Sequence, residues 1–352
     1  MAIEENREMK VAIIGFGLIG RERYNALREL QRGGFPINEI GVYDPYIPEE
    51  NKYNSGIIWF ESLKEIEENN PDWVIVCTPH YVTVEIIKIA SKWNCRILME
   101  KPFGRNYKEA LELDSLFNND LINRCYVGFN YRFYPGIQKI YADYRNGLFG
   151  EIINMNCELG HGGNPDDANT WKSSPELNGS GALCDPGIHL IDLLNQFCIY
   201  GIVPKYGTAH KGVWNTGIQE EVNLILTSKN PVDGKNFSIN LKSSLVHWRS
   251  TFRFEIWGDK GYGIVTGRGR SYGPMEYVRG EKWGWKKGVS QRESEQLVSL
   301  STCELSFYDE LKALFFEKNN DGGNLVYRLE PCNSFEALLN MKLYEDCFRV
   351  II

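Results

Sequence analysis

The sequence has no apolar run that approaches the roughly 18 residues typical of a membrane-spanning helix. Residues 1–9 are polar and charged, which is unlike a secretory signal peptide. The chain also lacks an excess of basic residues, because its formal net charge is −7, and this argues against binding to nucleic acid or another polyanion. We therefore expect neither a nucleic-acid partner nor a membrane partner.

Paired cysteine motifs are missing as well. The nine cysteines are an odd number at irregular spacing, and none belongs to a C-x-x-C pair. This pattern disfavours a disulfide framework, and cysteines in apolar runs behave as small buried hydrophobes. We expect a cytoplasmic protein, and its 352 residues suggest two domains or one large one.

What the sequence does contain is a glycine-rich turn between a short apolar run, residues 11–14, and a helical pattern. The turn has G-x-G-x-x-G spacing and consists of Gly15, Phe16, Gly17, Leu18, Ile19 and Gly20. Such glycines allow a tight turn, a close approach of backbone to a pyrophosphate, and close packing of helix on strand. The helix N-terminus then offers free N–H groups to the phosphates. We expect Leu18, Ile19, Ala26, Leu27 and Leu30 on one broad apolar face of this helix, which a helix of this kind buries.

An acidic residue at the end of the second apolar run supports the same interpretation. Asp44 follows residues 37–43 and lies 24 positions beyond Gly20, where a carboxylate can accept hydrogen bonds from the adenosine ribose. A carboxylate there also repels a 2′-phosphate, and no Arg or Lys is near it in the sequence. We therefore predict NAD as the cofactor, in preference to NADP. The alternative is an ordinary βαβ turn followed by a surface aspartate.

Strands and helices alternate through the first part of the chain, which predicts a doubly wound parallel sheet over residues 1–125. Ligands bind at the carboxyl ends of the strands in such sheets. The residues expected there, besides the glycine turn and Asp44, are Cys77, Thr78, Pro79, His80, Glu100, Lys101 and Pro102. Lys101 could hold a substrate hydroxyl or act as an acid or base, or be a surface lysine. His80 could contact the cofactor or be a simple loop residue.

Residues 126–352 show a different pattern, with several strands grouped together and helices at either side, which predicts an α+β domain with a large, mostly antiparallel, open sheet. Within it, Asp185-Pro186 has the form of a helix start, with Asp185 as N-cap and Pro186 as first helical residue. The loop of residues 267–273 contains Arg268 and Arg270, and we interpret it as a hairpin turn in preference to an anion contact.

The expected helix after Pro186 is apolar apart from one polar stripe. Asp185, His189, Asp192 and Gln196 lie at i, i+4, i+7 and i+11, so they share a face that should meet a cavity or polar partners. A histidine beside a carboxylate is a good general base. Two structural alternatives remain: Asp185 as a simple cap and His189 as a satisfied core histidine. A metal site would need further ligands that no spacing supplies, so we expect no metal.

Taken together, these motifs resemble those of the Gfo/Idh/MocA family, named after glucose–fructose oxidoreductase, inositol dehydrogenase and a rhizopine catabolism protein. The resemblance rests on the glycine turn, Thr78-Pro79, Glu100-Lys101-Pro102, Tyr131-Arg132-Phe133 and residues 185–192, Asp-Pro-Gly-Ile-His-Leu-Ile-Asp, in family order and spacing. The chain departs from the family at Thr83, where relatives often carry a histidine, and at Cys77, where small or branched residues are usual.

The resemblance implies that Lys101, Asp185 and His189 are catalytic, and that the peptide bond before Pro102 is cis. It also implies a homodimer or homotetramer formed through the open sheet of the C-terminal domain. We consider Asn130, Arg132, His161 and Trp171, together with the catalytic residues, as candidates to line a substrate pocket.

The expected activity is NAD-dependent oxidation of a secondary alcohol in a small-molecule carbohydrate: a free sugar, an inositol, a sugar acid or a nucleotide sugar. His189 would accept the proton with help from Asp185, and Lys101 would stabilise the alkoxide. A second hypothesis is an enzyme that keeps NAD bound and catalyses net elimination, hydrolysis or epimerisation. A third is a non-catalytic NAD-binding regulator.

Overall fold

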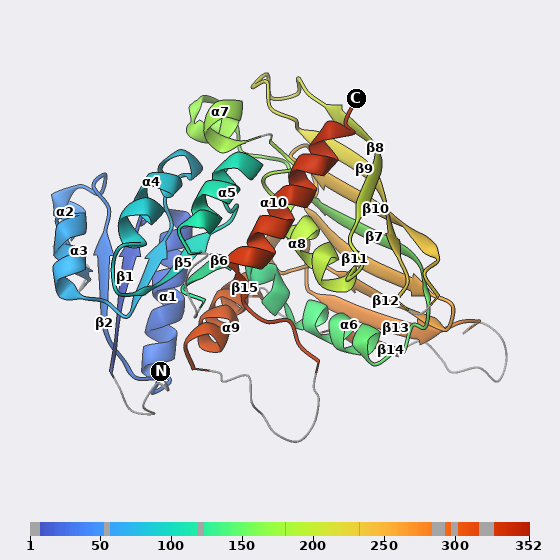
Figure 1. Cartoon of the computed structure of the whole chain (residues 1–352), viewed down its shortest axis with the longest axis horizontal. Helices are drawn as coiled ribbons and strands as arrows, with labels where there is room; N and C mark the ends of the chain where they lie inside the picture. The colour runs from blue at the N-terminus through green and yellow to red at the C-terminus, as the bar shows by residue number, and fades with distance from the viewer. Residues whose placement is uncertain are drawn as a thin grey trace. The chain divides into compact units, whose positions relative to one another are not determined.

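The computed structural model describes residues 8–52, 57–117, 123–179, 181–231, 233–283, 293–296, 302–316 and 327–352. The chain forms two compact units (Figure 1). Unit 1 comprises Met1–Phe129, Phe307–Glu317 and Pro331–Leu338, and unit 2 comprises Asn130–Ser306, Lys318–Glu330 and Leu339–Ile352. The first unit thus ends four residues after the boundary expected at residue 125 and regains two segments from the C-terminal part of the chain.

Unit 1 contains a seven-stranded sheet in the order β15-β6-β5-β4-β1-β2-β3. Its strands are β1 (Met9–Ile14), β2 (Ile37–Tyr43), β3 (Ile58–Trp59), β4 (Trp73–Val76), β5 (Arg96–Glu100), β6 (Cys125–Gly128) and β15 (Cys332–Asn333). All neighbouring pairs are parallel except β15 with β6. The continuous burial of β4 is typical of a parallel strand covered on both faces. The predicted doubly wound sheet is confirmed.

The helices of unit 1 follow the strands in the expected alternation (Figure 1). They are α1 (Leu18–Arg32), α2 (Glu49–Lys52), α3 (Leu63–Asn69), α4 (His80–Ala90) and α5 (Tyr107–Ser115). Helix α9 (Thr302–Phe316) adds Leu311 and Phe315 to the apolar core of this unit. The ring centroids of Phe315 and Trp73 are 4.6 Å apart. This packing explains why a segment so late in the sequence belongs to the first unit.

Unit 2 contains an eight-stranded sheet in the order β14-β13-β12-β11-β7-β10-β9-β8. Its strands are β7 (Ile152–Gly160), β8 (Val203–His210), β9 (Glu221–Lys229), β10 (Asn236–Ser244), β11 (Thr251–Gly258), β12 (Gly261–Thr266), β13 (Glu276–Glu281) and β14 (Glu293–Gln296). Only β7 and β10 pair in parallel. The predicted α+β unit with a mostly antiparallel sheet is therefore confirmed.

Helices α6 (Pro135–Arg145) and α8 (Ile188–Phe197) cover one face of this sheet (Figure 1). Helix α6 packs on β12 and β13, and α8 packs on β7 and on the short helix η1 (Asn130–Phe133). Helix α10 (Ser334–Arg349) starts in unit 1 and ends in unit 2. Along β9, Val222, Leu224 and Leu226 are buried in alternation with more exposed residues, as expected for a sheet covered on one side.

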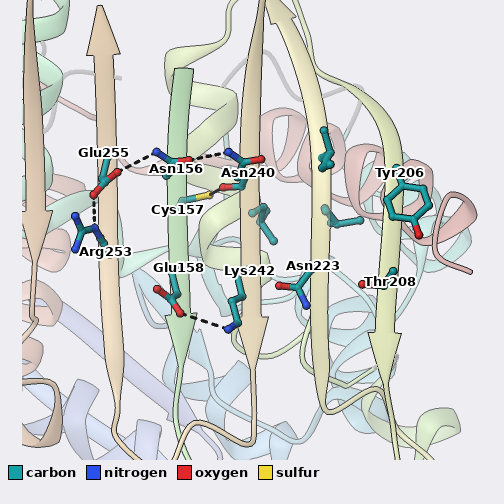
Figure 2. A pocket seen from close by; sticks show the side chains of 13 residues that line it. Asn156, Cys157, Glu158, Tyr206, Thr208, Asn223, Asn240, Lys242, Arg253 and Glu255 are labelled. Carbon is teal, nitrogen blue, oxygen red and sulfur yellow. Dashed lines mark hydrogen bonds and ion pairs between the residues drawn. The ribbon is translucent and has the colours of Figure 1, made fainter. Parts of the chain in front are cut away.

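The other face of the sheet carries polar side chains together with exposed apolar ones such as Tyr206 and Ile225, around a hollow of about 590 Å³ (Figure 2). Asn240 donates to the Asn156 side chain (2.8 Å), and Asn156 donates to Glu255 (2.9 Å). Lys242 lies 3.8 Å from Glu158 on the neighbouring strand. These cross-strand contacts link three strands, and the expected association of copies through this face stays a prediction.

Candidate active site

The glycine turn follows β1 as predicted, and two of its glycines are required by close contacts. A Cβ on Gly15, which has φ +92°, would lie 2.6 Å from the Cys77 carbonyl oxygen. A Cβ on Gly20 would lie 2.1 Å from the Gly15 carbonyl oxygen. Neither position accepts a side chain without movement of the backbone, so the two glycines set how closely α1 and the end of β4 approach the turn.

Gly17 is different, because a Cβ there would meet no atom of the protein within 4 Å. Gly17 is also the N-cap of α1, and no side chain caps the helix. The first-turn N–H groups of a helix have no partner within the helix, and together with the helix dipole they favour an anion. The open space at Gly17 and the uncapped helix end therefore fit the pyrophosphate of a dinucleotide.

Leu18, at the start of α1, does not lie where the apolar pattern placed it. Its side chain is 72% exposed, whereas Ala26, Leu27 and Leu30 are buried. The expectation that Leu18 belongs to the buried face is therefore wrong. The first turn of α1 lies beside the open space of the glycine turn, so its outward side chains have nothing to pack against.

Asp44 lies directly after β2 and is tied to the glycine turn. Its carboxylate accepts hydrogen bonds from the backbone N–H of Phe16 (2.7 Å) and of Tyr46 (2.9 Å). The two bonds hold the carboxylate between the ends of β1 and β2, the edge where ligands of such sheets bind. The structure thus brings the two cofactor motifs of the sequence together.

The other predicted cofactor residues lie after β4 and β5. The hydroxyls of Thr78 and Thr83 are 2.9 Å apart, so Thr83 supports the turn at the position where family relatives often carry a histidine. His80 is the first residue of α4, and Pro79 is its N-cap. Lys101 follows β5 directly, and the Lys101–Pro102 peptide bond is cis, as the resemblance implies.

A buried arginine next to these turns was not anticipated from the sequence. Arg23 of α1 is fully buried, donates to Glu100 (2.7 Å) and lies 2.5 Å from the carboxylate of Glu310. Burial disfavours its charged form, but the carboxylates of Glu100 and Glu310 outweigh this and raise the pKa of Arg23 above its usual value. Because Glu100 directly precedes Lys101, this ion pair fixes the backbone that carries Lys101. The sequence contained one signal of this buried ion pair: Arg23 lies on the otherwise apolar face of α1.

Cys77, also beside this cluster, is held as a neutral thiol. Burial, and then the charge of Glu100, raises its pKa well above the usual value, against the opposing effect of Arg23. A thiol in this state is a poor nucleophile. The eight cysteines whose side chains the structure describes are free thiols.

In unit 2, the segment around Asp185 begins differently from the prediction. Helix α8 starts at Ile188 with Gly187 as its N-cap, so Asp185 is not the cap and Pro186 is not the first helical residue. Residues 182–187 form turns, in which the N–H of Asp185 donates to Gly181 and that of Gly187 donates to Ala182. The Asp185–Pro186 peptide bond is cis. The two backbone hydrogen bonds to Gly181 and Ala182 place Asp185 in the turns before the helix.

The polar stripe of α8 meets polar and aromatic partners. His189 is 5% exposed, and its ring stacks on Tyr131 with centroids 3.9 Å apart and planes 11° apart. Asp192 is fully buried and accepts two hydrogen bonds from Arg132, at 2.9 and 2.6 Å, and a third from Asn340 at 2.7 Å. Within the stripe, Asp192 therefore anchors the helix, whereas His189 stacks on an aromatic ring.

Arg132 and Asn130, predicted as pocket residues, lie within this support. Arg132 is 0% exposed and also donates to the Glu330 carbonyl oxygen (3.0 Å), while Asn130 donates to the Ser306 hydroxyl (2.8 Å). A bidentate buried guanidinium gives geometric precision to its partner. We expect Arg132 to act on the site by positioning α8, and not by contact with a ligand.

Asp185 and His161 both line one pocket of unit 2. The pocket has a volume of about 190 Å³. It is lined by His161, Gly163, Asn164, Asp167, Lys172, Ser173, Asn178, Asp185, Trp214, Thr216, Ile218 and Leu245. Trp171 lies in the short helix η3 (Trp171–Ser173), next to the lining residue Lys172. The lining residues come from the three segments that connect β7 with α8, β8 with β9, and β10 with β11. Local sequence patterns therefore carried no signal for Asn164, Asp167, Asn178, Trp214 or Thr216.

The described residues contain no group of three or more His, Cys, Asp or Glu side chains that could hold a metal ion. In that same part of the chain, no helix is both long and apolar enough to cross a membrane. The side chains of the pocket offer two carboxylates, an ammonium group, an imidazole, amides, two hydroxyls and an indole, which together can bind a hydroxylated ligand and move a proton.

The parallel sheet, the open glycine turn and Asp44 define unit 1 as an NAD(P)-binding domain of the Rossmann type. Comparison with known families agrees. Residues 9–129 match the family described as "Oxidoreductase family, NAD-binding Rossmann fold", and residues 137–263 match the Gfo/Idh/MocA C-terminal domain. The chain belongs to the Gfo/Idh/MocA family of oxidoreductases.

The similarity to individual members of the family is low. The chain is 27% identical to the D-glucoside 3-dehydrogenase of Escherichia coli over 191 residues, which are 52% of each chain. It is 25% identical to the rhizopine catabolism protein MocA of Rhizobium meliloti over 190 residues, which are 52% of this chain and 55% of the relative. The chain spans about half the length of the curated relatives it matches. Its fold resembles that of levoglucosan dehydrogenase in complex with NADH, with a TM-score of 0.77, 16% identity and coverage of 98% and 97%.

Proposed function

We propose that the chain is an NAD-dependent dehydrogenase that oxidises a secondary alcohol of a sugar or sugar derivative. The observation that carries the proposal is the pocket of unit 2, where Asp185, His161 and several amide and hydroxyl groups converge. The other unit of the chain holds a turn fit for a dinucleotide pyrophosphate. The named relatives support the substrate class, since they include a glucoside dehydrogenase.

Bound NAD would supply the hydride acceptor. The chain's own residues handle the proton and the charge: the imidazole of His189 accepts the proton of the reacting hydroxyl. The stack on Tyr131 and the anchoring of α8 by Arg132 and Asp192 fix the orientation of that ring. In the proposed mechanism Asp185 stabilises the charged imidazole, and Lys101 donates a hydrogen bond to the same substrate oxygen.

Asp44 supports NAD as the preferred cofactor over NADP. Its carboxylate is fixed by two backbone N–H groups, so it cannot turn away from a 2′-phosphate without losing both bonds. Repulsion of that phosphate would weaken NADP binding relative to NAD.

The test begins with the cofactor. We would denature the purified protein and assay the released nicotinamide, then screen polyols and sugars for reduction of added NAD or NADP. Reduction of NAD by a sugar supports the proposal. NAD that stays bound, with substrate consumed and no net reduction, would identify a recycling enzyme instead. Binding of neither dinucleotide would refute both activities and the regulator hypothesis.

The role of His189 is tested with His189→Asn against His210→Asn, which changes an exposed histidine at the end of β8. We expect turnover to fall roughly 10²–10⁴-fold in the first variant, the range for loss of a general base, and to stay unchanged in the second. Thermal melting of both variants separates this effect from unfolding. Near-normal turnover of the folded His189→Asn variant would refute the assignment.

A further inference from the structure

The pocket of unit 2 contains a cation that is already neutralised. Lys172 is the only lysine or arginine among the described residues that line this pocket. Its ammonium group lies 3.2 and 3.1 Å from the two carboxylate oxygens of Asp167, which lines the same pocket. Asp185 adds a second carboxylate to the lining. The pocket therefore offers no unbalanced positive charge to a ligand.

We propose that the Lys172–Asp167 pair makes this pocket selective for uncharged, polyhydroxylated substrates, with Asp167 as the specificity-determining residue. This inference rests on the proposed function and narrows it. Free sugars, glycosides and inositols fit the pocket, whereas sugar acids and phosphate-bearing sugars meet carboxylates without a free cation.

The pair is held in place by the loop that carries it. The N–H of Lys172 donates to the Thr170 hydroxyl (3.3 Å), and its carbonyl oxygen accepts from the Asn178 side chain (2.7 Å). The carbonyl oxygen of Asp167 accepts from the hydroxyls of Thr170 (3.0 Å) and Ser173 (2.6 Å). Both backbones are thus fixed, so the two charged groups start within reach of each other.

The exposure of the pair indicates that its role is not mainly structural. The side chains of Lys172 and Asp167 are 47% and 29% exposed. Ion pairs with this much solvent contact contribute little to folding stability. Their charges still shape the potential at the pocket, which determines which ligands enter it.

The rest of the lining suits a neutral sugar. Trp214 is fixed by its indole N–H, which donates to the Leu245 carbonyl oxygen (3.0 Å), and by an edge contact with Trp248 at a centroid distance of 5.9 Å. A sugar ring has an apolar face that an indole can cover and hydroxyls that amides and hydroxyl groups can bind. The volume of about 190 Å³ is smaller than the roughly 300–1,000 Å³ of pockets for drug-sized ligands, which favours a small ring over a nucleotide sugar.

The experiment compares two ligands that differ in one charge, methyl β-glucoside and methyl β-glucuronide, by calorimetric titration with NADH present, which cannot accept a hydride from the ligand. Wild-type protein should bind the glucoside at least tenfold more tightly. In Asp167→Asn the freed Lys172 should raise the affinity for the glucuronide about tenfold, and Lys172→Met in that background should reverse the gain. The matched control is Asp166→Asn, which removes the charge of the neighbouring exposed aspartate that does not line the pocket, and it should leave both affinities unchanged.

A glucuronide affinity that stays the same in Asp167→Asn, or equals the glucoside affinity in the wild type, would overturn the proposal, as would binding of neither ligand. Raising the salt concentration should weaken glucuronide binding to Asp167→Asn more than glucoside binding. Since binding is measured without turnover, charge selectivity without NAD reduction would refute the dehydrogenase activity and retain the selective pocket.

Discussion

The dinucleotide turn of unit 1 and the pocket of unit 2 are built by different means. The turn is made of backbone: glycines without side chains, helix N–H groups, and one carboxylate held by two N–H groups. The pocket is made of side chains that three connecting segments bring together. A site made of backbone depends on positions without a Cβ atom, such as Gly17. A site made of side chains depends on the packing and ion pairs that hold those side chains in place. Substitutions should therefore affect the two units in different ways.

The largest effect should come from the scaffold of unit 2. In Arg132→Met the fully buried carboxylate of Asp192 loses its guanidinium partner, and the free energy of unfolding should fall by about 3–5 kcal/mol. Chemical denaturation measures this change. The control is Arg279→Met, which breaks the partly exposed pair with Asp143 and should cost less than about 1 kcal/mol. Equal losses in the two variants would show that α8 does not depend on its buried ion pair.

An intermediate effect should separate the glycines of unit 1. Gly20→Ala forces a Cβ against the Gly15 carbonyl oxygen and should destabilise the fold by about 1–3 kcal/mol, as overpacking does. Gly17→Ala places its methyl group in open space, so stability should stay close to that of the wild type while NAD affinity falls about tenfold, or about 1.4 kcal/mol. Denaturation and cofactor titration of both variants measure this. A Gly17→Ala variant that loses stability but binds NAD as tightly as the wild type would contradict the idea that Gly17 serves the cofactor and not the fold.

The smallest effect should come from the polar face of the unit 2 sheet, at Glu221. Burial raises the pKa of this carboxyl, but hydrogen bonds from Asn223 and Ser244 and the charges of Lys242 and His247 outweigh it, so the pKa is lowered. A lowered pKa stabilises the fold above the unfolded value of about 4.3, and this contribution is lost as the pH falls through the folded value. Glu221→Gln should therefore cost a few tenths to about 1 kcal/mol at pH 7. The difference from wild type should vanish near pH 3, and a difference that grows on acidification would contradict this sign.

Features that depend on residues close together in the sequence could be predicted, whereas features that depend on contacts with distant residues could not. The turn at Gly15–Gly20, the strand before it and the acid at Asp44 are local signals, because each motif needs only its own neighbours to function. The exposure of Leu18 was missed since the apolar pattern does not show which helix end faces an open space. The start of α8 was missed for a related reason: Asp185 and Pro186 have the composition of a helix start, but hydrogen bonds to Gly181 and Ala182 hold the segment in turns.

Charged residues in the core were harder still. From its residue type alone, Arg132 could equally contact a ligand, and only its buried ion pair with Asp192 indicates a positioning role. Arg23 gave a weak local signal on the face of α1, while its partner Glu310 lies 287 positions further along the chain. Because an unpaired buried charge is costly, a buried ion pair identifies residues that hold the fold together. The sequence spacing between the two partners follows no rule, so the pair cannot be found without the structure.

The sequence by itself determined the two-sheet architecture, the dinucleotide turn and the family to which the chain belongs, because hydrophobic periodicity and short motifs encode them locally. The tertiary structure alone decided that the C-terminal segments return to unit 1, that Arg132 anchors α8, and that Asp167 and Trp214 line one pocket. Those arrangements depend on packing between residues far apart in the chain, where burial, volume and charge balance select the partners.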